Sequence, residues 1–162
     1  IGNATQSATV LSVFTAAAFV VGLLYGNISK ILKQFSASIG ALFVGLSFVV
    51  LIFANSLTML IIGAVIFGIG FGLFNPAIVI AVAKSATKPK YAAVAISIYV
   101  SGTGIGQFLS PYVLKFLRGT LNLTASRADW QIAAVTLILG SAISMVLVAL
   151  SVKNTNEISQ EA

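Results

Sequence analysis

Charged residues divide the chain into long apolar intervals. Four charge-free intervals run over residues 1–29, 34–83, 91–114 and 130–152. A helix needs about 20 mostly apolar residues to cross the hydrocarbon core of a bilayer, so three of the intervals fit one crossing each. The second interval fits two, because the turn-favouring residues Asn55 and Ser56 interrupt it near its middle. The pattern predicts five spans, at roughly 7–28, 37–54, 57–83, 91–116 and 130–152.

The same pattern favours helices over barrel strands. Segments such as 42–53 and 136–148 are apolar almost all round, whereas barrel strands alternate apolar and polar residues over about ten positions. In lipid every backbone amide needs a partner, and a helix supplies that partner internally. The predicted fold class is all-α: a polytopic transmembrane helical bundle of five spans, followed by a tail over residues 153–162.

Composition narrows the range of functions. Hydrophobic residues make up 59% of the chain and charged residues 7%, too little polar surface for a water-soluble enzyme or a nucleic-acid-binding domain. Cysteine and histidine are absent, and the three acidic residues (Asp129, Glu157 and Glu161) lie outside the spans. This leaves no ligand set for a metal and no acid, base or thiol for catalysis. We expect no enzymatic activity, no cofactor and no nucleic-acid partner.

The basic residues predict the orientation in the membrane. One side of the five-span topology holds Lys30, Lys33, Lys84, Lys88, Lys90 and Lys153, and the other holds Lys115, Arg118 and Arg127. The side richer in Lys and Arg faces the cytoplasm, so the C-terminus is predicted to be cytoplasmic in a multi-pass protein of the cell membrane. An odd number of spans with a bare outer terminus predicts that an upstream part of the same protein precedes this chain.

Two glycine-rich stretches, 68–76 and 102–111, each carry three alternating glycines and then a proline. At 3.6 residues per turn, the first and third glycines share one helix face and the second lies roughly opposite. The paired glycines are Gly68 and Gly72 in the first stretch, and Gly102 and Gly106 in the second. Such pairs allow helices to pack closely. Alternatively, Pro76 and Pro111 each leave a carbonyl one turn earlier unbonded, so that these helices bend and line a polar path.

Polar residues also follow one face in these spans. Tyr99, Thr103, Gln107 and Ser110 fall at i, i+4, i+8 and i+11, while Phe71 and Asn75 share a face with Gly68, beside Phe74. An amide in a membrane span is costly unless it meets a partner or water. Asn75 and Gln107 therefore either bond a neighbouring helix or line a cavity suited to a neutral or amphipathic organic solute.

These motifs resemble the C-terminal part of a major facilitator superfamily transporter, over its helices eight to twelve. Gly26, Lys30 and Lys33 resemble the basic loop after helix eight, although Lys30 stands where an acidic residue is usual and a second glycine is missing. Residues 68–76 with 84–90 resemble helix ten and its cytoplasmic loop, and 102–111 resemble helix eleven. Residues 129–131 resemble the tryptophan-led start of helix twelve.

The resemblance implies alternating access, with two six-helix halves rocking about a central site. It implies that Phe71, Phe74 and Asn75 line the cavity, and that Tyr99, Thr103 and Gln107 face its edge or the other half. The implied partners are the bilayer, the missing N-terminal half of the same transporter and a small organic solute.

Energy coupling and two rival functions stay open at this stage. A proton-driven transporter needs a titratable group inside the membrane, and the spans hold no acidic residue and no histidine. Either the coupling residues are upstream or the protein is a facilitator; resemblance to bacterial drug and metabolite efflux members favours proton-coupled efflux. The alternatives are a non-transporting membrane scaffold or sensor subunit, and an intramembrane enzyme that would lack catalytic groups.

Overall fold

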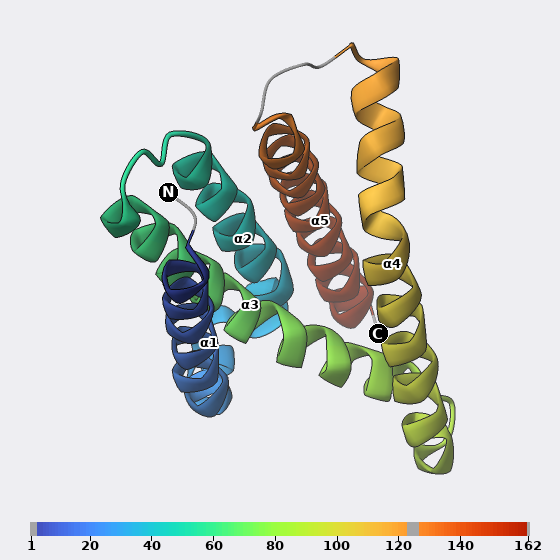
Figure 1. Ribbon diagram of the computed structural model, residues 1–162. Helices are drawn as coiled ribbons and strands as arrows, with labels where there is room; N and C mark the ends of the chain where they lie inside the picture. The colour runs from blue at the N-terminus through green and yellow to red at the C-terminus, as the bar shows by residue number, and fades with distance from the viewer. Residues whose placement is uncertain (1–2, 123–126, 162) are drawn as a thin grey trace.

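The computed structural model describes residues 3–122 and 127–161, which fold into five α-helices (Figure 1). They are α1 (Ala4–Leu32), α2 (Ser36–Ile52), α3 (Leu57–Ser85), α4 (Ala92–Thr120) and α5 (Ala128–Glu161). Two short 3₁₀ turns, η1 (Lys33–Phe35) and η2 (Pro89–Tyr91), precede α2 and α4. These residues contain no strand, so the predicted all-α class is confirmed.

Within the described residues, four helical stretches are long and apolar enough to cross a membrane: 4–52, 57–85, 89–120 and 128–152. The first contains both α1 and α2, which run in opposite directions on either side of η1 (Figure 1). Each of the five segments predicted from hydropathy therefore overlies one helix. Where the sequence analysis places a tail, α5 continues as a helix to Glu161.

Helix starts follow local chemistry. Asn3 caps α1, its side-chain oxygen accepting a hydrogen bond from the Gln6 amide at 2.8 Å. Ser56 caps α3 in the same way, accepting from the Met59 amide at 3.3 Å. Capping side chains of this kind satisfy amides that have no partner inside the helix. The polar break at Asn55 and Ser56 is thus the point where α2 ends and α3 begins.

The helices form a packed group and one outlying helix. In Figure 1, α2 lies between α3 and α5, α1 packs on α3, and α4 meets the end of α3 but stands away from α1 and α2. Buried side chains among the described residues are mostly small, such as Ala64 and Ala134, and Ser38 of α2 bonds Ser144 of α5 at 2.6 Å. By contrast, α4 has no buried residue. Small side chains let helix backbones approach closely in a membrane.

Glycine contacts account for the crossings of α3. A Cβ placed on Gly70 would lie 2.7 Å from the Gly40 carbonyl oxygen of α2, and one on Gly40 would lie 2.8 Å from the Gly70 oxygen. On the opposite face, a Cβ on Gly68 would lie 2.6 Å from the Phe14 oxygen of α1, and one on Gly72 would lie 2.7 Å from the Ala18 oxygen. The two faces inferred from sequence therefore contact two different helices.

Arginines join the helix ends near the start of α5. Arg127 donates to the carbonyl oxygens of Ile52 and Ala54, the latter at 2.7 Å, and to the Asn55 side chain at 3.1 Å. These acceptors include backbone groups at the end of α2 that lack partners in the helix. Arg118 of α4 pairs with Asp129 of α5 at 3.4 Å. The loop between α2 and α3 is thereby fixed to the beginning of α5.

Candidate functional site

Phenylalanine rings cluster where α1, α2 and α3 meet. The Phe67 ring of α3 lies edge to face with Phe14 of α1, at 5.1 Å between centroids, and with Phe48 of α2, at 5.7 Å. Phe71, one turn further along α3, stacks on Phe67 at 6.3 Å and meets Phe14 edge to face at 5.8 Å. Each such pair contributes about 0.5–1.5 kcal/mol beyond the burial of its area. The cluster therefore fixes the relative positions of three helices.

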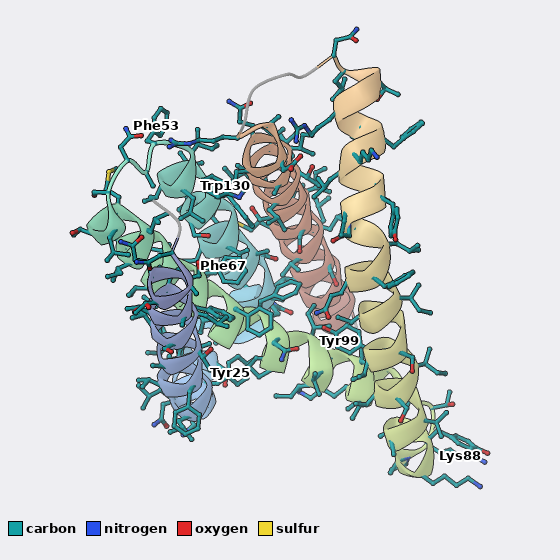
Figure 2. The ribbon with its side chains drawn as sticks, in the orientation of Figure 1. Tyr25, Phe53, Phe67, Lys88, Tyr99 and Trp130 are labelled. Carbon is teal, nitrogen blue, oxygen red and sulfur yellow. The ribbon has the colours of Figure 1, made fainter. Side chains whose placement is uncertain are left out.

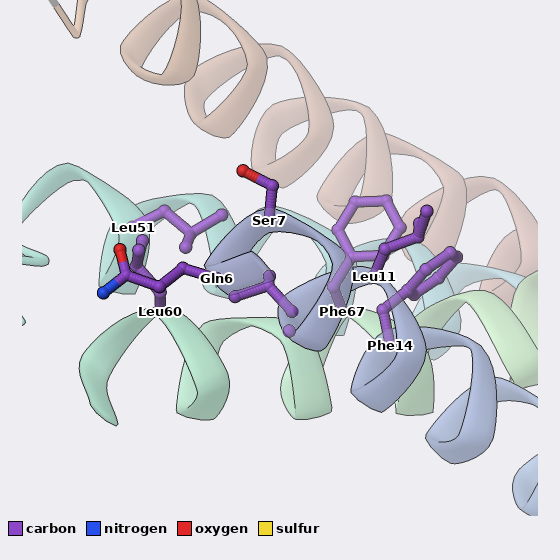
Figure 3. A pocket seen from close by; sticks show the side chains of 9 residues that line it. Gln6, Ser7, Leu11, Phe14, Leu51, Leu60 and Phe67 are labelled. Carbon is purple, nitrogen blue, oxygen red and sulfur yellow. The ribbon is translucent and has the colours of Figure 1, made fainter. Parts of the chain in front are cut away.

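A cavity of about 370 Å³ adjoins this cluster, between the first half of α1 and the ends of α2 and α3 that meet at the loop (Figure 3). One side of the cavity is formed by Phe14, Phe67 and Leu11, and the other side by Leu51 and Leu60. Gln6 and Ser7 contribute its polar groups. A largely apolar cavity of this size with a few polar groups is typical of sites for small organic molecules.

None of the α3 residues named from sequence lines this cavity. Phe71 belongs to the phenylalanine cluster and keeps 37% of its surface exposed. Phe74 is half-buried, and Asn75 is exposed. Of the three, Phe71 alone shares ring contacts with residues that line the cavity.

The polar stripe of α4 lies apart from the cavity in the described chain. Tyr99 is half-buried, whereas Thr103 and Gln107 are exposed (Figure 2 labels Tyr99). The Thr103 hydroxyl donates to the Tyr99 carbonyl at 2.9 Å, a bond within its own helix. No atom of the described chain beyond the helix's own nearby backbone lies within 4 Å of a Cβ placed on Gly102 or Gly106. The stripe and its glycines therefore form an open surface.

Both prolines lie inside continuous helices. Pro76 is in α3 and Pro111 is in α4. Proline has no amide hydrogen, so it leaves the carbonyl four residues earlier without its helical bond. At Pro111 that carbonyl belongs to Gln107, and the Ser110 hydroxyl donates to it at 3.3 Å. A side chain of the same helix thus supplies a partner for the carbonyl that Pro111 leaves without its helical bond.

The basic loop residues lie at the other end of the molecule. Gly26 and Lys30 are exposed on the last turns of α1, and Lys33 ends that helix with φ 49°. Lys33 also lines a second cavity together with Lys84 of α3. Figure 2 labels Lys88 at this end, while Phe53 and Trp130 lie at the opposite end.

No sequence motif marks the residues that form the aromatic cavity. Phe14 and Phe67 are separated by more than 50 positions, and Gln6 and Ser7 stand at the start of the first apolar interval without a distinguishing motif. The helical spacing of Phe67 and Phe71 was the one available signal. It defines a ring-bearing face of α3 but does not show which helix covers that face.

The described side chains provide no group of three or more His, Cys, Asp or Glu residues that could hold a metal ion. The aromatic cavity has no charged residue in its wall. Its lining is therefore equipped to bind by shape, ring contacts and single hydrogen bonds.

Comparison with known proteins identifies the family. The family model described as Major Facilitator Superfamily matches residues 1–161, whereas no curated protein and no solved structure matches the chain. The match agrees with the apolar helices of an integral membrane protein. The chain therefore belongs to the major facilitator superfamily, a family of membrane transporters for small solutes and not of enzymes.

Proposed function

We propose that this chain supplies helices eight to twelve of a secondary transporter that moves a small organic solute by alternating access. The observation that carries the proposal is the uncharged aromatic cavity between α1 and α3, in a chain whose family transports solutes. In this assignment α1 to α5 correspond in order to helices eight to twelve.

The cavity lining supports a neutral or amphipathic organic solute. Phe14 and Phe67 offer ring faces and edges, and Leu11 and Leu60 offer aliphatic contact. Gln6 and Ser7 add hydrogen-bonding groups at the wall. An inorganic ion would bind weakly in this cavity. The lining offers few oxygen ligands and no charges to replace the water molecules that the ion would lose.

The exposed polar faces of α3 and α4 support an extended solute path. Asn75 and Gln107 both lie on exposed surface of the described chain. An amide facing lipid would be costly, so we assign both to a path shared with the N-terminal half of the same transporter. Pro76 and Pro111 lie on these same two helices, which we propose bend as the halves rock.

We propose proton-coupled efflux of a drug or metabolite across the cell membrane, with the C-terminus in the cytoplasm. The separation of the loop cations supports this orientation: Lys33 and Lys84 share one end of the molecule, and Arg118 and Arg127 lie at the other. Because the predicted spans hold no acidic residue and no histidine, we assign the proton-binding group to the N-terminal half.

Reconstitution in liposomes tests this function. With an imposed pH gradient, we expect the purified full-length transporter, which includes the N-terminal half, to move the amphipathic dye rhodamine 6G. Ser7→Leu fills the cavity wall without removing a packed side chain, so it should slow transport by about tenfold, equal to roughly 1.4 kcal/mol. Ser12→Leu is the matched control, because Ser12 is also exposed on α1 but does not line this cavity.

Two results would contradict the proposal. Failure of a correctly inserted protein to move any of a varied panel of solutes, with the gradient applied, would favour a non-transporting scaffold or sensor subunit. Equal rates for Ser7→Leu and Ser12→Leu would remove the aromatic cavity from the solute path.

A further inference from the structure

A second cavity, of about 530 Å³, lies at the end of α2 remote from the aromatic one. The last turns of α1, the turn η1, the start of α2 and the last turns of α3 enclose it. Its polar lining consists of Tyr25, Ser29, Lys33, Gln34, Ser36 and Lys84. Two ammonium groups, hydroxyl groups and an amide therefore border one space.

Helical spacing brings these side chains together. Tyr25, Ser29 and Lys33 follow one another at intervals of four, so they share one side of α1 and its end. On α3, Ala77, Ala81 and Lys84 fall at i, i+4 and i+7, again on one face. The α1 side of the cavity is thus polar, whereas the α3 side is an apolar strip that ends in a lysine.

The backbone of Lys33 is held in a conformation that a lysine rarely adopts. Its φ of 49° lies in the region that favours glycine, and helices commonly use glycine where they end in this way. Its amide donates to the Ser29 carbonyl, and its carbonyl accepts from the Ser36 hydroxyl at 2.7 Å. Ser36 is buried, so both bonds fix the point from which the Lys33 side chain leaves the backbone. Strain of this kind concentrates at functional positions.

Among the described side chains, no acidic group lies near the two lysines of the cavity. Among residues whose side chains the structure describes, Asp129 is the one acidic residue, and it pairs with Arg118 beyond the far end of α2. A helix of 17 residues, roughly 26 Å, separates that pair from the cavity. None of the side chains that the structure describes brings a carboxylate to the cavity, so Lys33 and Lys84 retain their capacity to bind an external anion.

We propose that this cavity is a binding site for a phosphate group, held by Lys33 and Lys84 with further donors from the Tyr25 hydroxyl and the Gln34 amide. Ammonium and hydroxyl groups make short, charge-assisted bonds to phosphate oxygens. The apolar strip of Ala77, Ile80 and Ala81 adjoins the lysines, as an amphiphile bearing a phosphate requires. A phospholipid headgroup and a soluble phosphate share this chemistry. The site does not depend on the proposed transport function.

Binding measurements with two probes distinguish these sources. Inorganic phosphate is titrated against the purified protein in a zwitterionic detergent, and phosphatidylglycerol is compared with phosphatidylcholine in nanodiscs. We expect Lys33→Gln combined with Lys84→Gln to weaken binding of whichever probe binds by at least about tenfold. Lys30→Gln combined with Lys88→Gln removes the same net charge from exposed lysines outside the cavity, and should change affinity less than about twofold.

A further variant keeps both lysines in place. Ala81 is exposed within the cavity, so Ala81→Glu adds a carboxylate beside them and should abolish phosphate binding without disturbing the packed helices. Binding of phosphate alone would identify a soluble ligand, and binding of phosphatidylglycerol alone a lipid; either supports the site. Absence of binding by both probes, or equal loss in the two lysine pairs, would overturn it. Neither result bears on dye transport, so the two proposals fail independently.

Discussion

In α3, a methyl group added at Gly68, Gly70 or Gly72 would lie 2.7 Å or less from a backbone oxygen of α1 or α2. In α4, a methyl group at any of the glycines from Gly102 to Gly106 would find nothing within 4 Å. The two stretches have nearly the same order of glycines followed by a proline. A pattern of small residues therefore makes close packing against another helix possible. Whether a second helix packs there depends on the rest of the fold.

The difference extends to the helices as wholes. Seven residues of α3 are buried, including all three glycines of the repeat, whereas α4 has none buried. Side chains of α4 such as Ile105 and Phe108 are 61% and 69% exposed. In this chain the first repeat is a packing element, whereas the second lies on a surface that no other described helix covers.

The largest expected effect comes from breaking the packed repeat. Gly70→Leu would drive a side chain into the Gly40 carbonyl and the Val44 amide, both of which are backbone atoms that cannot rotate away. We expect destabilisation of roughly 3 kcal/mol or more, seen as aggregation or loss of the folded peak in detergent chromatography. Gly104→Leu, the matched change in α4, should leave the peak in place. If both variants behave alike, the contrast between the repeats is wrong.

A smaller effect is expected at the end of the packed group. Arg127→Ala removes donors to the Ala54 carbonyl and the Asn55 side chain, and frees the carbonyl at the end of α2. Because these are hydrogen bonds from a charged group, we expect a loss of about 2 kcal/mol, measured by denaturant titration in mixed micelles. Lysine cannot donate to several acceptors at once, so Arg127→Lys should recover less than half of the lost stability. An unchanged titration would show that Arg127 does not contribute to holding the end of α2 in place.

The smallest effect should have the opposite sign. Gly104→Ala adds a methyl group to open space and removes a flexible residue from a helix interior, so we expect stabilisation of about 0.5–1 kcal/mol. The same substitution at Gly70 should lower the free energy of unfolding. Paired unfolding measurements on the two alanine variants check this, and a gain at both positions would contradict the close contact between Gly40 and Gly70.

Hydropathy and turn chemistry predict most of the fold. The break at Asn55 and Ser56 is visible in sequence, and in the structure Ser56 caps α3 there. The opposite faces of Gly68 and Gly70 follow from helical spacing alone. That α1 would take one face and α2 the other does not follow, because the choice depends on contacts between segments far apart in the chain.

The residues of the candidate site were harder to predict from sequence for the same reason. Phe14 and Phe67 form a cavity wall only after α1 has packed on α3, and no local pattern encodes that pairing. The sequence predicts only a loop position for Arg127, yet its contacts lie at the end of α2, more than 70 positions earlier. Helical periodicity shows which residues share a face of one helix. A site formed by three helices depends also on where those helices cross, which periodicity does not show.

The unequal helix lengths have a consequence for the surrounding lipid. α2, with 17 residues, is roughly 26 Å long, whereas α1 and α3, with 29 each, are roughly 44 Å. A hydrocarbon layer of about 30 Å is slightly thicker than α2 and much thinner than its neighbours. The long helices can fit by tilting, and α3 runs obliquely to α2 (Figure 1). Because the glycine contacts join α2 directly to α3, a change in bilayer thickness that tilts one helix must also tilt the other.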